Sequence, residues 1–229
     1  MSGPTVSVVM AVLDSEPFLR ESLDSVVSQD HPVEIVVVDG GSTDDSVAIA
    51  SSYEQVRCLT QRGEGLGNAW NQGIAASTGE LIAFLDSDDR WLPGKLEKQI
   101  ARLEADPELV AVLGMVRFFL EPGERMPGGF RPQLLEGEHV GRMPGALLAR
   151  RRTFERLGVF EESYRIALDV DWFARLKDSG LGLGVVPELV LEKRVHRSNL
   201  SHSDQDLLAG ELTRAMHASV IRQRRSNDG

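Results

Sequence analysis

Cysteine is almost absent from this chain of 229 residues, which contains only Cys58. A single thiol excludes an intramolecular disulfide, and its setting in "VRCLT" favours a small buried strand residue over a reactive group. Long apolar runs are also absent, since the most apolar stretch, "LVAVLGMVRFFL", is too short to span a bilayer and contains Arg117. The N-terminal "MSGPTVSVVM" has no basic region ahead of an apolar core, so we expect no signal peptide and a cytoplasmic location.

Basic side chains are scarce in the first hundred residues, which hold 16 acids and 6 bases, whereas the remaining residues hold 19 of each. The net charge of −10 therefore lies in the N-terminal half and argues against a nucleic-acid partner. An acidic half that handles an anionic ligand needs a cation as intermediary. Without such a ligand it is simply a soluble surface, and both interpretations stay open at this point.

The first hundred residues alternate between apolar runs and segments with helical spacing. Strands are expected at 6–12, 33–38, 56–60 and 80–85, and helices at 15–29, 44–53, 67–77 and 93–105. Strands that are apolar on both faces and alternate with helices indicate a parallel sheet covered on both sides. After residue 107 the pattern changes to a long apolar strand and a Gly/Pro-rich connection at 121–132.

The C-terminal part is expected to contain three further helices. A strand followed by a short helix is expected at 143–158, and a helix at 169–180 is stopped by Gly180. The last helix, at 206–222, carries an apolar stripe formed by Leu208, Leu212, Ala215 and Met216. We expect this stripe to pack on the domain or on a second subunit of a homodimer.

Two of the expected strands end in carboxylates. "EIVVVDGGSTDDS" runs from a strand into Asp39, and "LIAFLDSDDRW" places Asp86, Asp88 and Asp89 directly after another. A carboxylate left buried and unpaired is costly, so each needs water, backbone donors, a cation or a ligand. The simpler alternative is that each acidic segment forms a turn followed by a helix cap. Asp44 would then cap the helix that follows Asp39, and Asp89 would cap the helix that follows the second strand.

The two acidic strand ends predict one shared crevice. Ligands of open α/β sheets bind outside the carboxyl ends of the strands, where Asp39 and the pair Asp86 and Asp88 can converge. Residues at i and i+2 on an extended backbone face the same way, so the pair can share one cation. Oxygen ligands suit Mg²⁺ or Mn²⁺, and such an ion lets an acidic crevice hold a diphosphate.

Four segments together resemble the family 2 glycosyltransferases, which are inverting enzymes with the GT-A fold. They are "VSVVMAVLDSEPFLRESLDSVVSQ", "EIVVVDGGSTDDS", "GNAWNQGIAASTGELIAFLDSDD" and "GVFEESYRIALDVDWFARL". The resemblance covers nearly the whole chain, and the order and spacing of the segments make it specific. It implies an α/β, GT-A-type fold with a Rossmann-like, mostly parallel central sheet flanked by helices and a mixed acceptor-side half.

The resemblance also implies a single domain over residues 1–229. Residues 1–105 would form the nucleotide-sugar-binding half, residues 106–202 the acceptor-side half, and residues 203–229 a C-terminal helix and tail. The implied partners are a nucleotide-sugar donor, with a UDP-sugar expected, and an acceptor that is a glycan, a lipid-linked molecule or a peptide.

The resemblance assigns roles to individual residues. Asp39 would contact the base of the donor, and Asp86 with Asp88 would form the DXD motif, with Asp88 on the Mn²⁺ or Mg²⁺ ion. The further donor-binding positions are Ala11, Asp14 and Asn71. An acid in "ALDVDW" would be the catalytic base, and by position it is Asp169. Such a carboxylate takes the proton of the attacking hydroxyl and contributes about 10²- to 10⁴-fold in rate.

Several residues depart from the family pattern. Gly40 stands where a second acid is common, so base recognition would depend more on Asp39. Trp70 replaces the Arg of an "ARN" motif, and we expect it to pack in the core. Leu168 stands where Glu often precedes the catalytic Asp. Asp171 lies two residues beyond Asp169, where a helix points it elsewhere, and we interpret it as structural.

Two basic segments have open interpretations. "EKRVHRSNLSH" contains Lys193, Arg194, His196 and Arg197, and His196 is a candidate metal ligand or diphosphate contact, the alternative being an ordinary surface loop. The cluster Arg150 to Arg152 with Arg156 is interpreted as a solvated helix start. Its alternative is contact with an anionic acceptor or with the inner membrane surface, which would make the protein peripheral.

Other protein classes fit less well. A dinucleotide-binding oxidoreductase needs a glycine cradle after its first strand, and "MAVLDSEPF" has none. A sugar nucleotidyltransferase would share the metal, the diphosphate and the type of fold, but the Asp169 segment favours sugar transfer. A noncatalytic nucleotide-sugar-binding protein is the third alternative.

Overall fold

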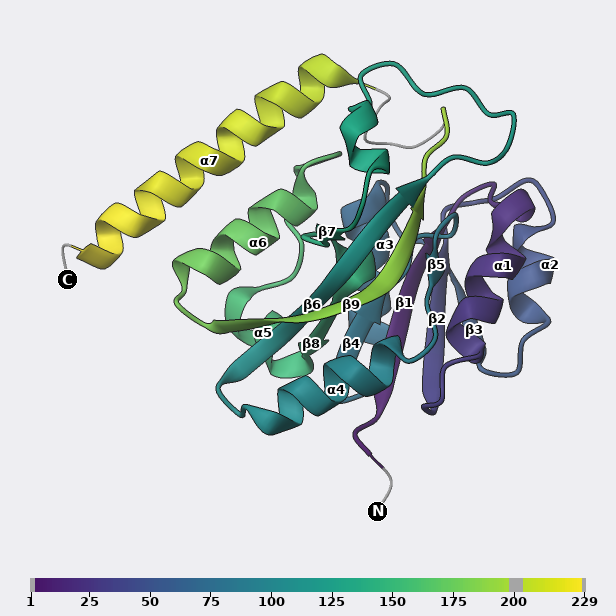
Figure 1. The fold of residues 1–229 in the computed structure, drawn as a ribbon, viewed down its shortest axis with the longest axis horizontal. Coiled ribbons are helices and arrows are strands. Elements are labelled where there is room, and N and C mark those ends of the chain that lie inside the picture. Colours follow the sequence, from purple (N-terminus) through teal and green to yellow (C-terminus); the bar gives the residue numbers. More distant parts are fainter. Residues whose placement is uncertain (1–2, 198–203, 228–229) are drawn as a thin grey trace.

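The computed structural model describes residues 3–197 and 204–227 (Figure 1). Within these ranges nine strands form one sheet in the order β3-β2-β1-β4-β8-β6-β9-β5, with β7 paired to β6. The strands are β1 (Val6–Val12), β2 (Val33–Asp39), β3 (Val56–Thr60), β4 (Leu81–Phe84), β5 (Arg90–Trp91), β6 (Leu109–Phe119), β7 (His139–Val140), β8 (Leu147–Arg150) and β9 (Gly182–Arg194). The helices are α1 (Glu16–Val27), α2 (Ser46–Ser51), α3 (Leu66–Ala76), α4 (Lys95–Ala105), α5 (Arg151–Leu157), α6 (Leu168–Asp178) and α7 (Gln205–Asn227).

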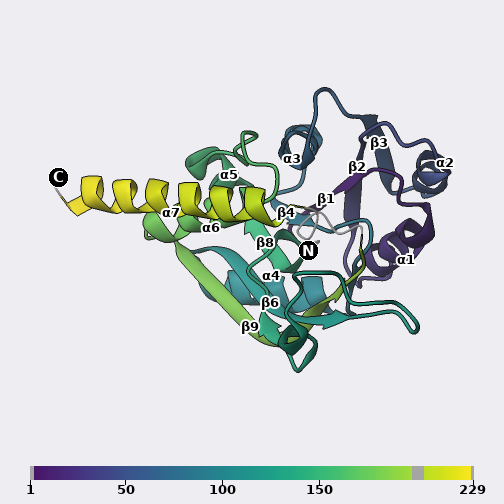
Figure 2. The same cartoon turned by 90° about the horizontal axis from the view of Figure 1, so that it is seen from above.

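The N-terminal half is a parallel sheet with helices on both faces. β1 pairs in parallel with β2 and β4, and β2 pairs in parallel with β3. Figure 2 shows α3 on one side of these strands and α1 with α2 on the other. Successive residues of β1 alternate accordingly, because Val8 and Met10 pack in one core cluster and Val9 in another. The apolar runs are thus explained by burial on both faces, as predicted.

The second half of the sheet is mixed. β8 runs antiparallel to both β4 and β6, β9 runs parallel to β6, and β5 runs antiparallel to β9. The sequence did not predict β5 or β7, nor the short 3₁₀ turns Pro132–Leu135 and Pro144–Ala146. Strands of two residues are too short to carry a periodic signal, so tertiary pairing alone defines them.

Arg150 and Arg151, at the start of α5, are not solvated, which corrects the prediction for these two members of the arginine cluster. Arg150 donates from Nε to Leu109 O at 3.0 Å and from a terminal nitrogen to Leu103 O at 2.8 Å, near the end of α4. Arg151 donates from Nε to Gly79 O at 2.7 Å and reaches Ile74 O at the end of α3. Both guanidinium groups therefore hold carbonyls near helix C-termini, where a positive charge is favourable.

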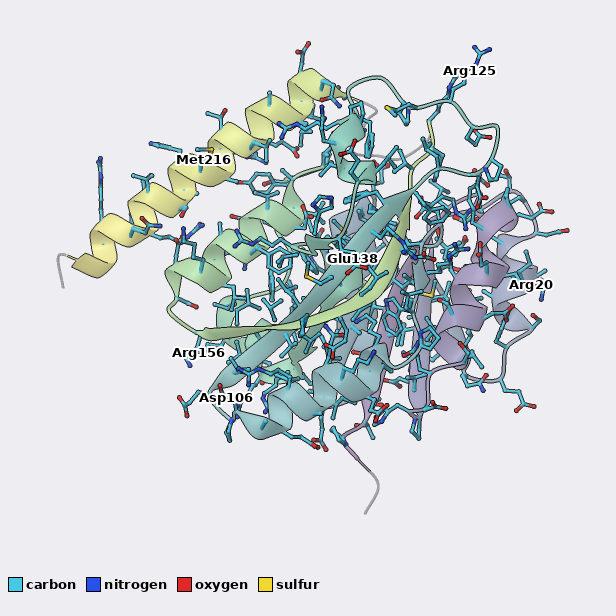
Figure 3. The ribbon with its side chains drawn as sticks, in the orientation of Figure 1. Arg20, Asp106, Arg125, Glu138, Arg156 and Met216 are labelled. Carbon is cyan, nitrogen blue, oxygen red and sulfur yellow. The ribbon has the colours of Figure 1, made fainter. Side chains whose placement is uncertain are left out.

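Arg152 and Arg156, in contrast, are exposed, and Figure 3 labels Arg156 on α5. The solvated interpretation therefore holds for these two side chains.

The last helix, α7, packs along α6, and its C-terminal end extends beyond the domain (Figures 1 and 2). Ala215 is buried, and Leu208 with Leu212 pack against the same cluster, as predicted. Met216 was wrongly included in the stripe, because its side chain is 68% exposed (Figure 3). Successive residues of a helix are about 100° apart around its axis, so Met216 points away from the face that contains Ala215.

No helix among the described residues combines the length and the apolar character needed to cross a bilayer.

Replacing Arg151 with Ala should destabilise the fold, because Gly79 O, Ile74 O and Ser77 Oγ would each lose the charged guanidinium donor. We expect a loss of about 1–3 kcal/mol in the free energy of unfolding by urea denaturation. Arg152→Ala is the matched control, because Arg152 is exposed and makes one contact of 3.5 Å to Pro107 O. Its effect should stay within about 0.5 kcal/mol. Equal losses in the two variants would contradict the capping role.

Candidate functional site

Asp39 ends β2 and is 6% exposed. Its carboxylate accepts the backbone N–H of Gly41 at 3.0 Å and of Ser42 at 3.2 Å, so the turn after the strand satisfies most of its charge. β1 lies between β2 and β4, which separates the ends of these two strands by about 10 Å at ordinary strand spacing. Asp39 therefore stands beside the acidic end of β4 but does not belong to it.

The loop after β1 is bound to the loop after β2. Asp14 has a φ of 45°, the only positive φ outside glycine among the described residues. Its carboxylate accepts the Thr43 N–H at 2.8 Å, and its own N–H donates to Ser42 Oγ at 2.9 Å. Ala11 lies on β1 opposite Val38, just before this loop. The structure thus fixes Asp14 at the sheet edge in a conformation that the two loops together stabilise.

Asp86, Asp88 and Asp89 follow β4, and their candidate ligand atoms lie within 4.8 Å of one another. Lys193 of β9 enters this cluster and donates to Asp86 at 3.0 Å and to Asp89 at 2.8 Å. The three carboxylates outweigh burial and raise the pKa of Lys193 well above its usual value. Lys193 is therefore a fixed cation whose charge offsets the repulsion among the three carboxylates.

The three carboxylates differ in their environment. Asp89 is fully buried and also accepts the Arg194 N–H at 2.8 Å, and burial raises its pKa to about 8. Asp88 accepts a hydrogen bond from His196 Nε2 at 2.8 Å when that nitrogen carries the proton. Burial acts to raise the pKa of Asp88, but this hydrogen bond and the charge of Lys193 outweigh it and hold the pKa below its usual value.

The donor set fits a hard divalent cation. A metal ligand must be deprotonated, which favours Asp88 over the buried Asp89. Asp86 is the most exposed of the three, with 35% of its side chain accessible, and His196 adds an imidazole beside Asp88. Carboxylate oxygens suit Mg²⁺ or Mn²⁺, whereas an imidazole is a poorer ligand for Mg²⁺. Asp86 and Asp88 could therefore hold such an ion, and His196 lies beside them through its hydrogen bond to Asp88.

The backbone of the acidic loop is held by α1. Ser22 Oγ lies 2.9 Å from Ser87 O and 2.6 Å from Asp89 O, and the hydroxyls of Ser15 and Ser87 share a 2.7 Å hydrogen bond. Arg194 donates from Nε to Asp88 O at 2.8 Å.

The role of Ser22 was not predicted. The sequence does contain a signal, which is a polar stripe at helical spacing formed by Ser22 and Ser25 of α1, with Ser15 just before the helix and Gln29 just after it.

Beside the acidic loop lies a hollow of about 420 Å³. It is lined by aromatic, acidic and basic side chains, among them Phe18, Glu124, His196 and Arg197. Phe18 packs against the ring of His196, with 5.2 Å between the ring centroids. His196 lines this hollow, whereas Asp86 and Asp88 are not among its lining residues.

Asp169 stands in the first turn of α6 and is partly buried. Burial raises its pKa to about 6, the charge of Asp86 acts in the same direction, and the hydrogen bond from Val170 N–H opposes it. Asp169 therefore lies within electrostatic range of Asp86, which follows β4. Asp171 instead accepts Arg175 Nε at 2.8 Å and is 4% exposed, in agreement with its expected structural role.

Asn71 and Trp70 of α3 contact the segment that precedes α6. Asn71 donates to Phe160 O at 2.8 Å and to Glu162 Oε1 at 3.0 Å, and its carbonyl accepts the Phe160 N–H at 2.9 Å. These bonds occupy the whole amide, so its role in donor binding stays a prediction without support from the contacts. Trp70 is 3% exposed and packs 4.9 Å from the Phe160 ring, which confirms its place in the core.

Asp169→Asn should stabilise the protein at neutral pH in the presence of EDTA. Because the pKa is raised from about 3.9 to about 6, the parent loses stability as pH rises through this interval and the neutral variant does not. With partial solvent access, we expect a gain of about 1–2 kcal/mol at pH 7.5 and almost none at pH 4, by urea denaturation. A less stable variant at pH 7.5 would mean that the carboxylate stabilises the fold.

Comparisons with known proteins agree with this geometry. The family model described as glycosyl transferase family 2 matches residues 7–167. An uncharacterized glycosyltransferase of Rickettsia typhi is 29% identical over 219 residues, which cover 88% of this chain and 67% of the relative. The putative glycosyltransferase EpsH of Bacillus subtilis is 34% identical over 131 residues, which cover 55% of this chain and 38% of EpsH.

Solved structures share the fold. S. aureus TarS (residues 1–349) in complex with UDP-GlcNAc superposes with a TM-score of 0.75 at 18% identity, covering 95% of this chain and 66% of TarS. The mannosyltransferase PcManGT of Pyrobaculum calidifontis, in complex with GDP-Man and Mn²⁺, gives 0.70 at 22% identity and covers 96% and 65%. The chain thus spans about two thirds of these structures, and its α/β fold is of the GT-A type, as the sequence predicted. Because the family model matches most of its length, the chain belongs to glycosyl transferase family 2.

Proposed function

We propose that the protein is a metal-dependent, inverting glycosyltransferase that moves a sugar from a nucleotide-diphosphate donor to an acceptor hydroxyl. The proposal rests on one observation, which is that carboxylates with lowered and raised pKa values lie within electrostatic range of one another. Asp86 and Asp88 follow β4, and Asp88 is hydrogen-bonded to His196. Asp169, in the first turn of α6, lies within electrostatic range of Asp86 and has a pKa raised to about 6. Carboxylates whose environments separate their pKa values are suited to separate roles.

Asp169 acts as general base in this proposal. Its raised pKa lies close enough to neutral pH for it to be ionised and still to accept a proton. In a single displacement the acceptor oxygen bonds to the anomeric carbon and its proton passes to Asp169. The bond from that carbon to the diphosphate oxygen breaks, and the electron pair leaves with the diphosphate, so the configuration inverts.

Asp88, Asp86 and His196 would hold Mn²⁺ or Mg²⁺, which when bound neutralises charge on the departing diphosphate. Lys193 keeps the carboxylates in place at the same strand end, and Asp39 is proposed to meet the base from β2. We take a UDP-sugar as the first donor to test, supported by the likeness to TarS in its UDP-GlcNAc complex. GDP-mannose is the second, by the likeness to PcManGT.

The division into a donor half at 1–105 and an acceptor half at 106–202 is part of the proposal. The acidic end of β4, the Asp14 loop and Asp39 all belong to the first half, whereas Asp169 and His196 belong to the second. The last residues of the acceptor half, 198–202, lie outside the described residues. Pyrophosphate release during turnover would favour a sugar nucleotidyltransferase instead.

Donor binding should depend on the metal, because the acidic loop otherwise repels a diphosphate. With Mn²⁺ and UDP at a hundredfold excess over the dissociation constant, we expect a ligand-linked stabilisation of about 2.7 kcal/mol in a thermal-shift assay, with GDP tested in parallel. Asp88→Ala should abolish it. Asp45→Ala is the control, because Asp45 is an exposed acid at the N-cap position before α2 and its loss leaves the acidic loop intact. Unchanged nucleotide affinity in excess EDTA would contradict the metal assignment.

Asp169→Asn should keep donor affinity and lose about 10²-fold or more in transfer rate, since the amide cannot accept the hydroxyl proton. Asp171→Asn is the matched control, two residues further along α6, and should retain most turnover. The measurement is single-turnover transfer with saturating donor and Mn²⁺, or donor hydrolysis until an acceptor is found. An active Asp169→Asn with an inactive Asp171→Asn would transfer the role of base to Asp171.

A further inference from the structure

The segment that leads into α6 is held by a single carboxylate from the C-terminal helix. Glu211 of α7 accepts the backbone N–H of Arg165 at 2.8 Å, of Ile166 at 2.9 Å and of Ala167 at 2.9 Å. Its side chain is buried, with 5% of the residue exposed. Burial acts to raise the pKa of Glu211, but the three N–H donors and the charge of Arg214 outweigh it and hold the pKa below its usual value.

The start of α6 needs this outside acceptor. Its N-cap position is Ala167, which has no side-chain oxygen and makes no capping hydrogen bond. Consecutive N–H groups that point the same way at a helix N-terminus form a positive site where a carboxylate is favourable. Glu211 supplies that carboxylate from α7, and Asp169 follows Ala167 by two residues.

A second contact from the same helix acts on the same segment. Arg214 donates to Ser163 O at 2.9 Å, and its guanidinium carbon lies 3.9 Å from the centre of the Tyr164 ring. The C-terminal half of α7 is attached elsewhere, because Ser219, Arg222 and Gln223 all donate to Asp178 at the end of α6. The contacts of Glu211 and Arg214 therefore lie on the segment that precedes Asp169, whereas the second attachment lies at the far end of α6. Arg222 of that second attachment also lies 3.7 Å from Asp171.

We propose that Glu211 is a positioning residue for the candidate base: it fixes the backbone of residues 165–167 and so sets the place of Asp169 at the start of α6. The inference rests on the proposed function, in which Asp169 accepts the proton of the acceptor. Displacing a reacting group by about 1 Å can lower a rate by about 10²-fold, so a residue that fixes the backbone two positions away can control turnover without touching substrate.

The test compares two full-length variants that break the two attachments separately. Glu211→Gln keeps the size of the side chain, removes the charge and turns an N–H₂ group toward N–H donors. Asp178→Asn does the same at the far end of α6. Arg214→Gln is a milder third variant on the approach segment, because Arg214 is exposed, and it replaces Glu211→Gln if that variant does not fold.

Two readouts are needed for each variant. Hydrogen exchange reports whether the amides of 165–167 remain protected. Steady-state UDP release from UDP-GlcNAc with Mn²⁺ gives kcat and KM, with GDP release from GDP-mannose if the thermal-shift assay selects GDP. For Glu211→Gln we expect exchange at these amides to rise at least about 10-fold, kcat to fall between about 10- and 10²-fold, and donor KM to stay within about threefold. Asp178→Asn should leave exchange at 165–167 and kcat within about twofold of the parent.

The outcomes separate this inference from the proposed function. If Glu211→Gln exposes the amides but keeps its kcat while Asp169→Asn is inactive, the positioning role is wrong and the proposed function stands. Equal losses of kcat in Glu211→Gln and Asp178→Asn would overturn the specific role of Glu211 in favour of general docking of α7. Full turnover by Asp169→Asn would overturn the proposed function itself, and with it the reason to position that residue.

Discussion

Three carboxylates lie within 4.8 Å of one another just after β4, and the surrounding structure depends on the need to offset their charge. Like charges at this distance are unfavourable unless cations and hydrogen-bond donors offset them. β9 supplies Lys193 to two of these carboxylates and ends at Arg194, two residues before His196. The long pairing of β9 with β6 therefore serves an electrostatic purpose, because it carries the offsetting side chains to the sheet edge.

The remaining supports of the site are polar groups placed on helices. Hydroxyls of α1 hold the backbone carbonyls after β4, an amide of α3 holds Phe160, and a carboxylate of α7 holds the N–H groups before α6. Each of these bonds is between a side chain and the backbone, so each fixes a loop without adding bulk to the crevice. Buried loop backbone needs such partners, since unpaired N–H and C=O groups are costly.

The sequence predicted the parallel half of the fold well, because strands 6–12 and 33–38 are apolar on both faces and are followed by clear helices. It also placed Trp70 in the core and Asp171 in a structural role, and both agree with the contacts. It failed where the deciding contact is distant along the chain. Arg151 looked solvated because Gly79 lies 72 positions away, and Glu211 was not singled out because its partners lie 44 to 46 positions away. Local periodicity contains no information about such pairs.

The serine stripe of α1 has a consequence for how the sequence can vary. An apolar inner face tolerates exchange among Leu, Ile, Val and Met, because packing is satisfied by volume. Ser22 is 1% exposed and lies between two carbonyl acceptors, so an apolar replacement there would remove the hydroxyl donor that the two carbonyls share. In a library of α1 variants selected for folding, the outer positions Arg20 and Glu16 would diversify, whereas Ser22 would accept little beyond another small hydroxyl residue.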